Sequence, residues 1–165
     1  MQSKARLLGH PIHQMLIVFP LGLLGMSLFF DLIGLIWDFD ALFPASYYMI
    51  AAGIITGLTA AVFGFIDWLG IPSGTRAKRV GLAHGSGNVV VVVLFAASWF
   101  LRRGNPADPA LVAVVLSAVG VGIALVTGWL GGELVDRLSV GVDEGAHVDA
   151  PSSLSGRPAT ERANR

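Results

Sequence analysis

The chain has 165 residues, of which 54% are hydrophobic and 13% are charged, and its formal net charge at pH 7 is zero. Its mean hydropathy of +0.70 lies on the apolar side of soluble domains and indicates a protein of the lipid bilayer. The neutral charge gives no reason to expect nucleic acid as a partner, and the lack of cysteine excludes disulfides, thiolate-bound iron–sulfur clusters and cysteine nucleophiles.

Four apolar runs, each about 20 residues long, follow one another along the chain and can each cross the hydrocarbon layer as a helix. They cover residues 15–36, 47–69, 80–101 and 110–130. Short connections with turn formers such as Pro44 and Pro72 favour antiparallel neighbours. We therefore expect an all-α fold, an integral membrane four-helix bundle that occupies residues 1–138.

Basic residues predict how the bundle is oriented. All but two of them fall on one side of the four runs: Lys4, Arg6, Arg76, Lys78, Arg79, Arg137, Arg157, Arg162 and Arg165. Only Arg102 and Arg103 fall on the other side. The positive-inside rule therefore predicts that the N-terminus and the C-terminus are cytoplasmic. Residues 139–165 are polar and lack helical periodicity, so we expect a disordered tail, in which His147 has no role.

Polar residues from all four predicted helices form a cluster at the predicted cytoplasmic face. The set consists of His10, His13, Asp67, His84, Asn88 and Glu133. His10 and His13 are spaced i, i+3, and His84 and Asn88 are spaced i, i+4, so each pair can share one side of a helix. Ionisable groups near the membrane interior are costly, and they tend to pair, to line water or to bind a ligand.

A weak internal repeat supports this convergence. Residues 6–10 precede the first helix much as residues 79–84 precede the third, and residues 67–70 resemble residues 128–131. Two similar hairpins related by a pseudo-two-fold axis along the membrane normal would bring His10 or His13 opposite His84.

Residues 9–13 (GHPIH) and 16–22 (LIVFPLG) resemble the opening motif of the bacterial membrane-protein family known as domain of unknown function 2231. Asp31, residues 64–67, His84 with Asn88, and residues 131–135 resemble its later markers, whereas Gln14 stands where the family more often has a second proline. The resemblance implies a four-helix protein of the bacterial inner membrane. Relatives fused to Rieske-type domains imply redox surroundings, but the resemblance implies no particular activity.

Three interpretations fit the cluster: a site for haem or a metal, a structural network, and a proton or solute pathway. His10, His13 and His84 are suitable ligands for haem b, and the same histidines with Asp67 and Glu133 are suitable ligands for a divalent metal. The second alternative is a structural network, in which Asp67 and Glu133 pair with Arg79 and Arg137 while Asn88 bridges two helices. The third is a proton or solute pathway.

Asp31 stands apart, in the outer third of the first helix. It is either the far end of a proton route or, as we expect, the partner of a tyrosine near the outer interface. No GxSxG, HExxH, P-loop or GxGxxG motif is present, so a stand-alone enzyme is unsupported. Our interpretation is a redox-associated membrane subunit with a redox protein as its partner. The competing interpretations are a non-catalytic assembly protein and a small transporter.

Overall fold

The computed structural model describes residues 1–163, and Arg165, counted above among the basic residues, lies outside them. Four helical spans are long and apolar enough to cross a membrane, which confirms the predicted fold class. The first combines α1 (Ile12–Leu16) with α2 (Val18–Trp37), and the next two are α3 (Leu42–Gly70) and α4 (Arg76–Arg102). The fourth combines α5 (Leu111–Gly132) with a π-helical turn, η1 (Glu133–Arg137).

The helices extend past the apolar runs, and in α4 a side-chain cap, which hydropathy does not detect, sets where the helix begins. α4 begins at Arg76 rather than at residue 80, since the Thr75 hydroxyl accepts a hydrogen bond from the Lys78 backbone N–H at 3.1 Å. At the other end of the same helix, Arg102 belongs to the last turn and not to the following connection.

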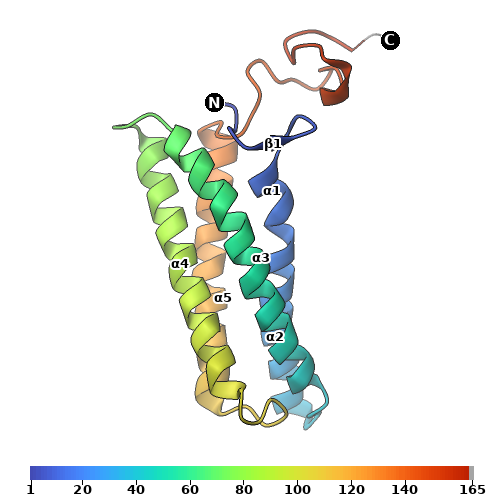
Figure 1. Cartoon of the computed structure of the whole chain (residues 1–165), viewed down its shortest axis with the longest axis vertical. Coiled ribbons are helices and arrows are strands. Elements are labelled where there is room, and N and C mark those ends of the chain that lie inside the picture. The colour runs from blue at the N-terminus through green and yellow to red at the C-terminus, as the bar shows by residue number, and fades with distance from the viewer. Residues whose placement is uncertain (164–165) are drawn as a thin grey trace.

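The helices form one antiparallel bundle (Figure 1). α2 and α4 run in the same direction, and each packs against both α3 and α5, so α2 lies diagonally across the bundle from α4. The N-terminus, the connection at residues 71–75 and the C-terminal tail share one end, which we call the terminal end. The connections at residues 38–41 and 103–110 share the other end, which we call the distal end.

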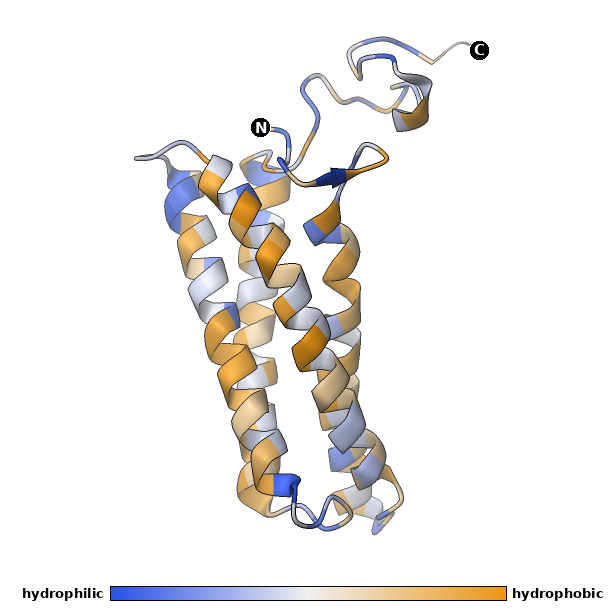
Figure 2. Ribbon diagram, viewed as in Figure 1, coloured by the Kyte–Doolittle hydropathy of each residue, from blue (hydrophilic) through white to orange (hydrophobic). Residues whose placement is uncertain are grey.

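The helices are apolar along most of their length (Figure 2), and many of their large apolar side chains are exposed. Leu125 is 73% exposed and Ile55 is 66% exposed, as expected of helices that face lipid. At mid-depth Leu24, Ile50, Val91 and Phe95 form a buried cluster. Each end of the bundle is therefore separated from the other by an apolar layer.

The two helical hairpins repeat each other in their buried positions. In α2 the buried residues 24, 27 and 31 each have a buried counterpart 71 positions later in α4, at residues 95, 98 and 102. In α3 the buried residues 46, 50, 53 and 60 each have one 67 positions later in α5, at residues 113, 117, 120 and 127. The repeat thus has a different register from the one suggested by residues 67–70 and 128–131, which are only 61 positions apart.

The two ends of the chain contact each other above the terminal end of the bundle. A short hairpin joins β1 (Arg6–Leu7) to β2 (His10–Pro11), and the tail has a single 3-10 turn, η2 (Ser153–Ser155). The Met1 amino group donates to the Ser139 carbonyl at 2.8 Å, and Arg6 forms an ion pair with Asp143 at 2.7 Å. The disorder of the tail stays a prediction.

Candidate functional site

His13 of α1 and His84 of α4 lie side by side, with ring centres 6.3 Å apart and ring planes perpendicular. His13 Nδ1 lies 2.8 Å from the Ala60 carbonyl oxygen of α3, and His84 Nδ1 lies 2.8 Å from the Thr127 carbonyl oxygen of α5. These two contacts are equivalent in the repeat, because residues 13 and 84 are 71 positions apart and residues 60 and 127 are 67 apart.

The carbonyl partners determine which nitrogen of each ring carries a hydrogen. A carbonyl oxygen can only accept a hydrogen bond, so Nδ1 of each ring carries the hydrogen. In a neutral imidazole Nε2 then keeps its lone pair, and a backbone carbonyl on Nδ1 is the usual arrangement for a histidine that binds metal through Nε2. When neutral, each ring therefore has the tautomer that allows Nε2 to bind a metal.

Two glycines let the rings lie against the neighbouring helices. A Cβ atom added at Gly64 would lie 2.8 Å from His13 Cε1, and one added at Gly131 would lie 3.2 Å from His84 Cε1. The first distance is closer than side-chain carbons approach and the second is tight. Gly64 and Gly131 are also 67 positions apart, so each half of the molecule provides one histidine and one glycine.

The Nε2 atoms of the two rings differ in their surroundings. His84 Nε2 lies 3.2 Å from Asn88 Nδ2, and Asn88 Oδ1 accepts a hydrogen bond from Thr127 Oγ1 at 2.9 Å. Asn88 thus bridges α4 and α5, as expected under the structural-network alternative. Within residues 1–163, His13 Nε2 has no hydrogen-bond partner.

His10 does not join this pair. It lies in β2, is exposed, and has its Nε2 3.3 Å from Ser153 Oγ in the tail. The expectation that His10 and His13 share one helical side is wrong, because Pro11 has extended backbone angles and α1 begins only at Ile12. The structure places His13, and not His10, next to His84.

Asp67 and Glu133 have partners other than those predicted. The Asp67 carboxylate accepts hydrogen bonds from Ser3 Oγ at 2.7 Å and from the backbone N–H groups of Lys4 and Ala5 at 2.8 and 3.2 Å. Glu133 forms an ion pair with Arg76 at 2.6 Å. The predicted pairing with Arg79 and Arg137 is therefore wrong. Residues 1–5 fold back onto the end of α3 and bind Asp67, and Arg76 binds Glu133.

The predicted set of five metal ligands is not assembled. Across residues 1–163, no three or more His, Asp or Glu side chains gather closely enough to hold a metal ion. What the structure brings together is a pair of imidazoles with one amide beside it.

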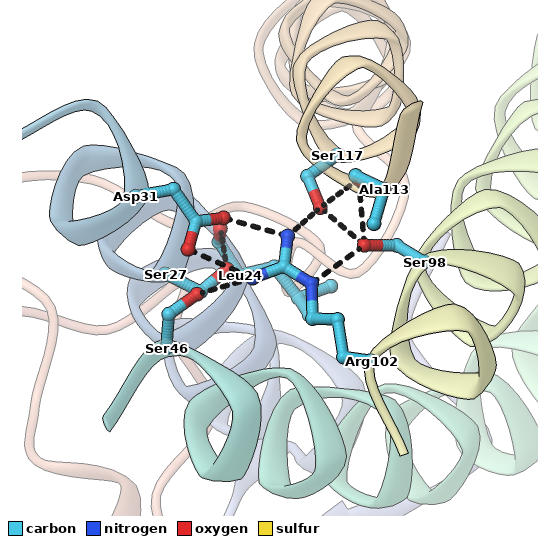
Figure 3. A network of polar contacts seen from close by, with 8 residues as sticks. All are labelled: Leu24, Ser27, Asp31, Ser46, Ser98, Arg102, Ala113 and Ser117. Atoms are coloured by element: carbon cyan, nitrogen blue, oxygen red, sulfur yellow. Dashed lines mark hydrogen bonds and ion pairs between the residues drawn. The ribbon is translucent and has the colours of Figure 1, made fainter. Parts of the chain in front are cut away.

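A second polar layer lies at the distal end (Figure 3). Arg102 donates from Nη1 and Nη2 to the two carboxylate oxygens of Asp31, both at 2.7 Å, and both side chains are fully buried. Its other contacts are serine hydroxyls, Ser98 with Nε at 3.2 Å, Ser46 with Nη1 at 3.2 Å and Ser117 with Nη2 at 3.3 Å. Every helix of the bundle contributes to this layer.

Sequence reasoning missed Arg102, and the expected tyrosine partner of Asp31 is wrong. The apolar run predicted for this helix ends at residue 101, yet Arg102 belongs to the last turn of α4 and points inward. A usable signal existed. The first and third spans run in the same direction, so an acid near the end of one and an arginine at the end of the other share a depth.

The sequence of residues 9–144 matches the model of a protein family described as a predicted membrane protein, DUF2231. The chain belongs to this family. The match confirms the resemblance noted from residues 9–13, and it includes His13, His84 and the Asp31–Arg102 pair. No curated protein and no solved structure matches the chain. The family description states membrane location and names no activity.

Proposed function

We propose that this protein is a redox-associated subunit of the bacterial inner membrane that holds haem b or a divalent metal ion between His13 and His84. The observation that carries the proposal is the matched state of the two rings, each with Nδ1 on a carbonyl. Ions bind imidazole nitrogen at about 2 Å, so one ion shared by two rings would put their centres about 5 to 6 Å apart, depending on the angle between the two ligands. The 6.3 Å between the ring centres fits that separation.

Each residue has a role in this proposal. His13 and His84 supply the two ligand nitrogens, while the Ala60 and Thr127 carbonyls fix the ring orientation and make the nitrogens more basic. Asn88 covers His84 Nε2 and moves aside when the site fills. A bound haem would supply one-electron transfer, which is the reason to expect a redox protein as partner.

The orientation proposed for the site is cytoplasmic. Arg102 is buried against Asp31, so it does not contribute a charge to the distal connections. Arg103 is then the one basic residue exposed at that end of the described chain. The terminal end, which carries the remaining basic residues of the described chain, is the cytoplasmic one by the positive-inside rule.

The test is ligand content. The full chain is expressed in bacteria with haem precursor, purified in mild detergent, and assayed for an absorption band of haem and for metals. It is then titrated with haemin and, separately, with Zn²⁺. We expect binding by the wild type, and loss of binding in His13→Ala and in His84→Ala. The matched controls His10→Ala and His147→Ala should bind as the wild type does.

A non-catalytic assembly role is the second candidate, and the closed contact between Asn88, His84 and Thr127 favours it. In that case the wild type binds neither haem nor Zn²⁺, and His84→Ala only lowers the thermal stability. That combination of results would overturn the ligand proposal.

A further inference from the structure

The buried ion pair occupies equivalent positions in the two hairpins. Asp31 and Arg102 are 71 positions apart, as are the buried pairs Ser27 with Ser98 and Leu24 with Phe95. The helices that carry them, α2 and α4, lie diagonally across the bundle. A position of one hairpin therefore meets its own counterpart at the centre of the molecule.

This placement has a consequence for which hairpins can pack together. Among the equivalent buried positions, charge occurs only at Asp31 and Arg102, and the other positions carry apolar, small or hydroxyl side chains. If the first hairpin packed on the first hairpin of another copy, two carboxylates would meet. Two second hairpins would bring two guanidinium groups together. Like charges buried at close range oppose association.

We propose that Asp31 and Arg102 determine hairpin pairing, so that the buried face of residues 12–70 accepts residues 76–137 and rejects a second copy of itself. A single buried polar contact that fixes partner and register is the best-attested use of such groups. The pair also fixes how far α2 and α4 are shifted along each other. That register is the one that brings His13 beside His84 at the terminal end.

One serine beside Arg102 has a counterpart beside Asp31, so an arginine exchanged to position 31 keeps one of its hydroxyl partners. Arg102 Nε donates to Ser98, four residues before it on the same helix, and Ser27 stands four residues before Asp31. An arginine at position 31 would therefore have Ser27 where Arg102 has Ser98. Ser27 now donates to the Leu24 carbonyl at 2.8 Å, and its oxygen can still accept a hydrogen bond.

The experiment exchanges the charges in the full-length protein. Asp31→Arg places two arginines at the centre, Arg102→Asp places two aspartates there, and the double variant restores one of each. The folded fraction that remains after heating in detergent is measured by size-exclusion chromatography. We expect each single variant to lose about tenfold in folded protein and the double variant to return to within about threefold of the wild type.

Two outcomes would overturn the proposal. The first is a double variant that is no better folded than the worse single variant, because equivalent positions must tolerate exchange. The second is a pair of single variants that fold as the wild type does, because like charges would then not affect pairing. The matched control is Arg76→Glu with Glu133→Arg, a partly exposed ion pair whose reversal should change folding much less in the single and the double variants.

Discussion

At the scale of single residues, the candidate site depends on what surrounds each imidazole. One carbonyl oxygen fixes Nδ1 of each ring, and one glycine provides the space for it. The carbonyls leave Nε2 as the only nitrogen that can bind a ligand. Asn88 then makes the two halves different, since its amide lies against Nε2 of His84 alone.

Alanine at the two glycines tests this packing. Gly64→Ala should lower the free energy of unfolding by about 1–3 kcal/mol, because its Cβ would overlap the His13 ring. Gly131→Ala should cost less, since His84 needs to move only a few tenths of an ångström. Gly22→Ala is the control, because a Cβ there has open space. Thermal unfolding in detergent measures all three, and an equal cost at Gly22 would contradict the account.

At the scale of elements, sequence patterns predicted the helices but only a few of the contacts between them. Hydropathy located all four spans because a membrane helix needs a continuous apolar run. It missed Thr75 as a cap, the hairpin of β1 and β2, and the inward position of Arg102. Those features depend on hydrogen bonds to distant or backbone groups, which residue composition does not record.

The candidate site was also predicted only in part. His84 lies beside His13 and Asn88 as their depth along the helices predicted, and their role in binding a ligand stays a prediction. His10 was misplaced, because the extended backbone at Pro11 ends the helical periodicity before it reaches His10. The partners of Asp67 could not be predicted, since residues 1–5 carry no pattern that indicates where they fold.

Asp67 holds the N-terminal segment on the end of α3, and this contact can be tested by proteolysis. Asp67→Ala removes the acceptor of the bonds from Ser3, Lys4 and Ala5. We expect trypsin to cleave after Lys4 and Arg6 faster in this variant than in the wild type, while the bundle stays intact. Mass spectrometry of timed digests measures the rates. Glu133→Gln, which loses only an exposed ion pair, should leave them unchanged, and an equal acceleration there would contradict the assignment.

At the scale of the whole molecule, two polar layers are separated by an apolar one. The apolar layer between the histidine pair and the ion pair consists of Leu24, Ile50, Val91 and Phe95. Within the described chain, this layer interrupts any continuous path of polar side chains through the interior of the bundle. The histidine pair is near the terminal end and the ion pair is near the distal end. Orientation in the membrane therefore decides which compartment the histidines face.

Reporter fusions test that orientation. A reporter inserted at residues 71–75 and one fused after the C-terminus should both be cytoplasmic, because the exposed basic residues concentrate at the terminal end. A reporter inserted at residues 38–41 should be periplasmic. Alkaline phosphatase is active only in the periplasm and green fluorescent protein fluoresces only in the cytoplasm, so the two reporters give opposite signals at each position. A periplasmic C-terminus would move the candidate site to the other side of the membrane.

The most direct test of the histidine pair is the ¹⁵N NMR spectrum of the imidazole rings in the detergent-solubilised, ¹⁵N-histidine-labelled protein. The chain has four histidines, so His13→Ala and His84→Ala assign the two signals that matter. We predict that Nδ1 carries a hydrogen in both rings and that the two rings show contacts with each other. A ring whose Nδ1 carries no hydrogen, or two rings without contact, would contradict this prediction.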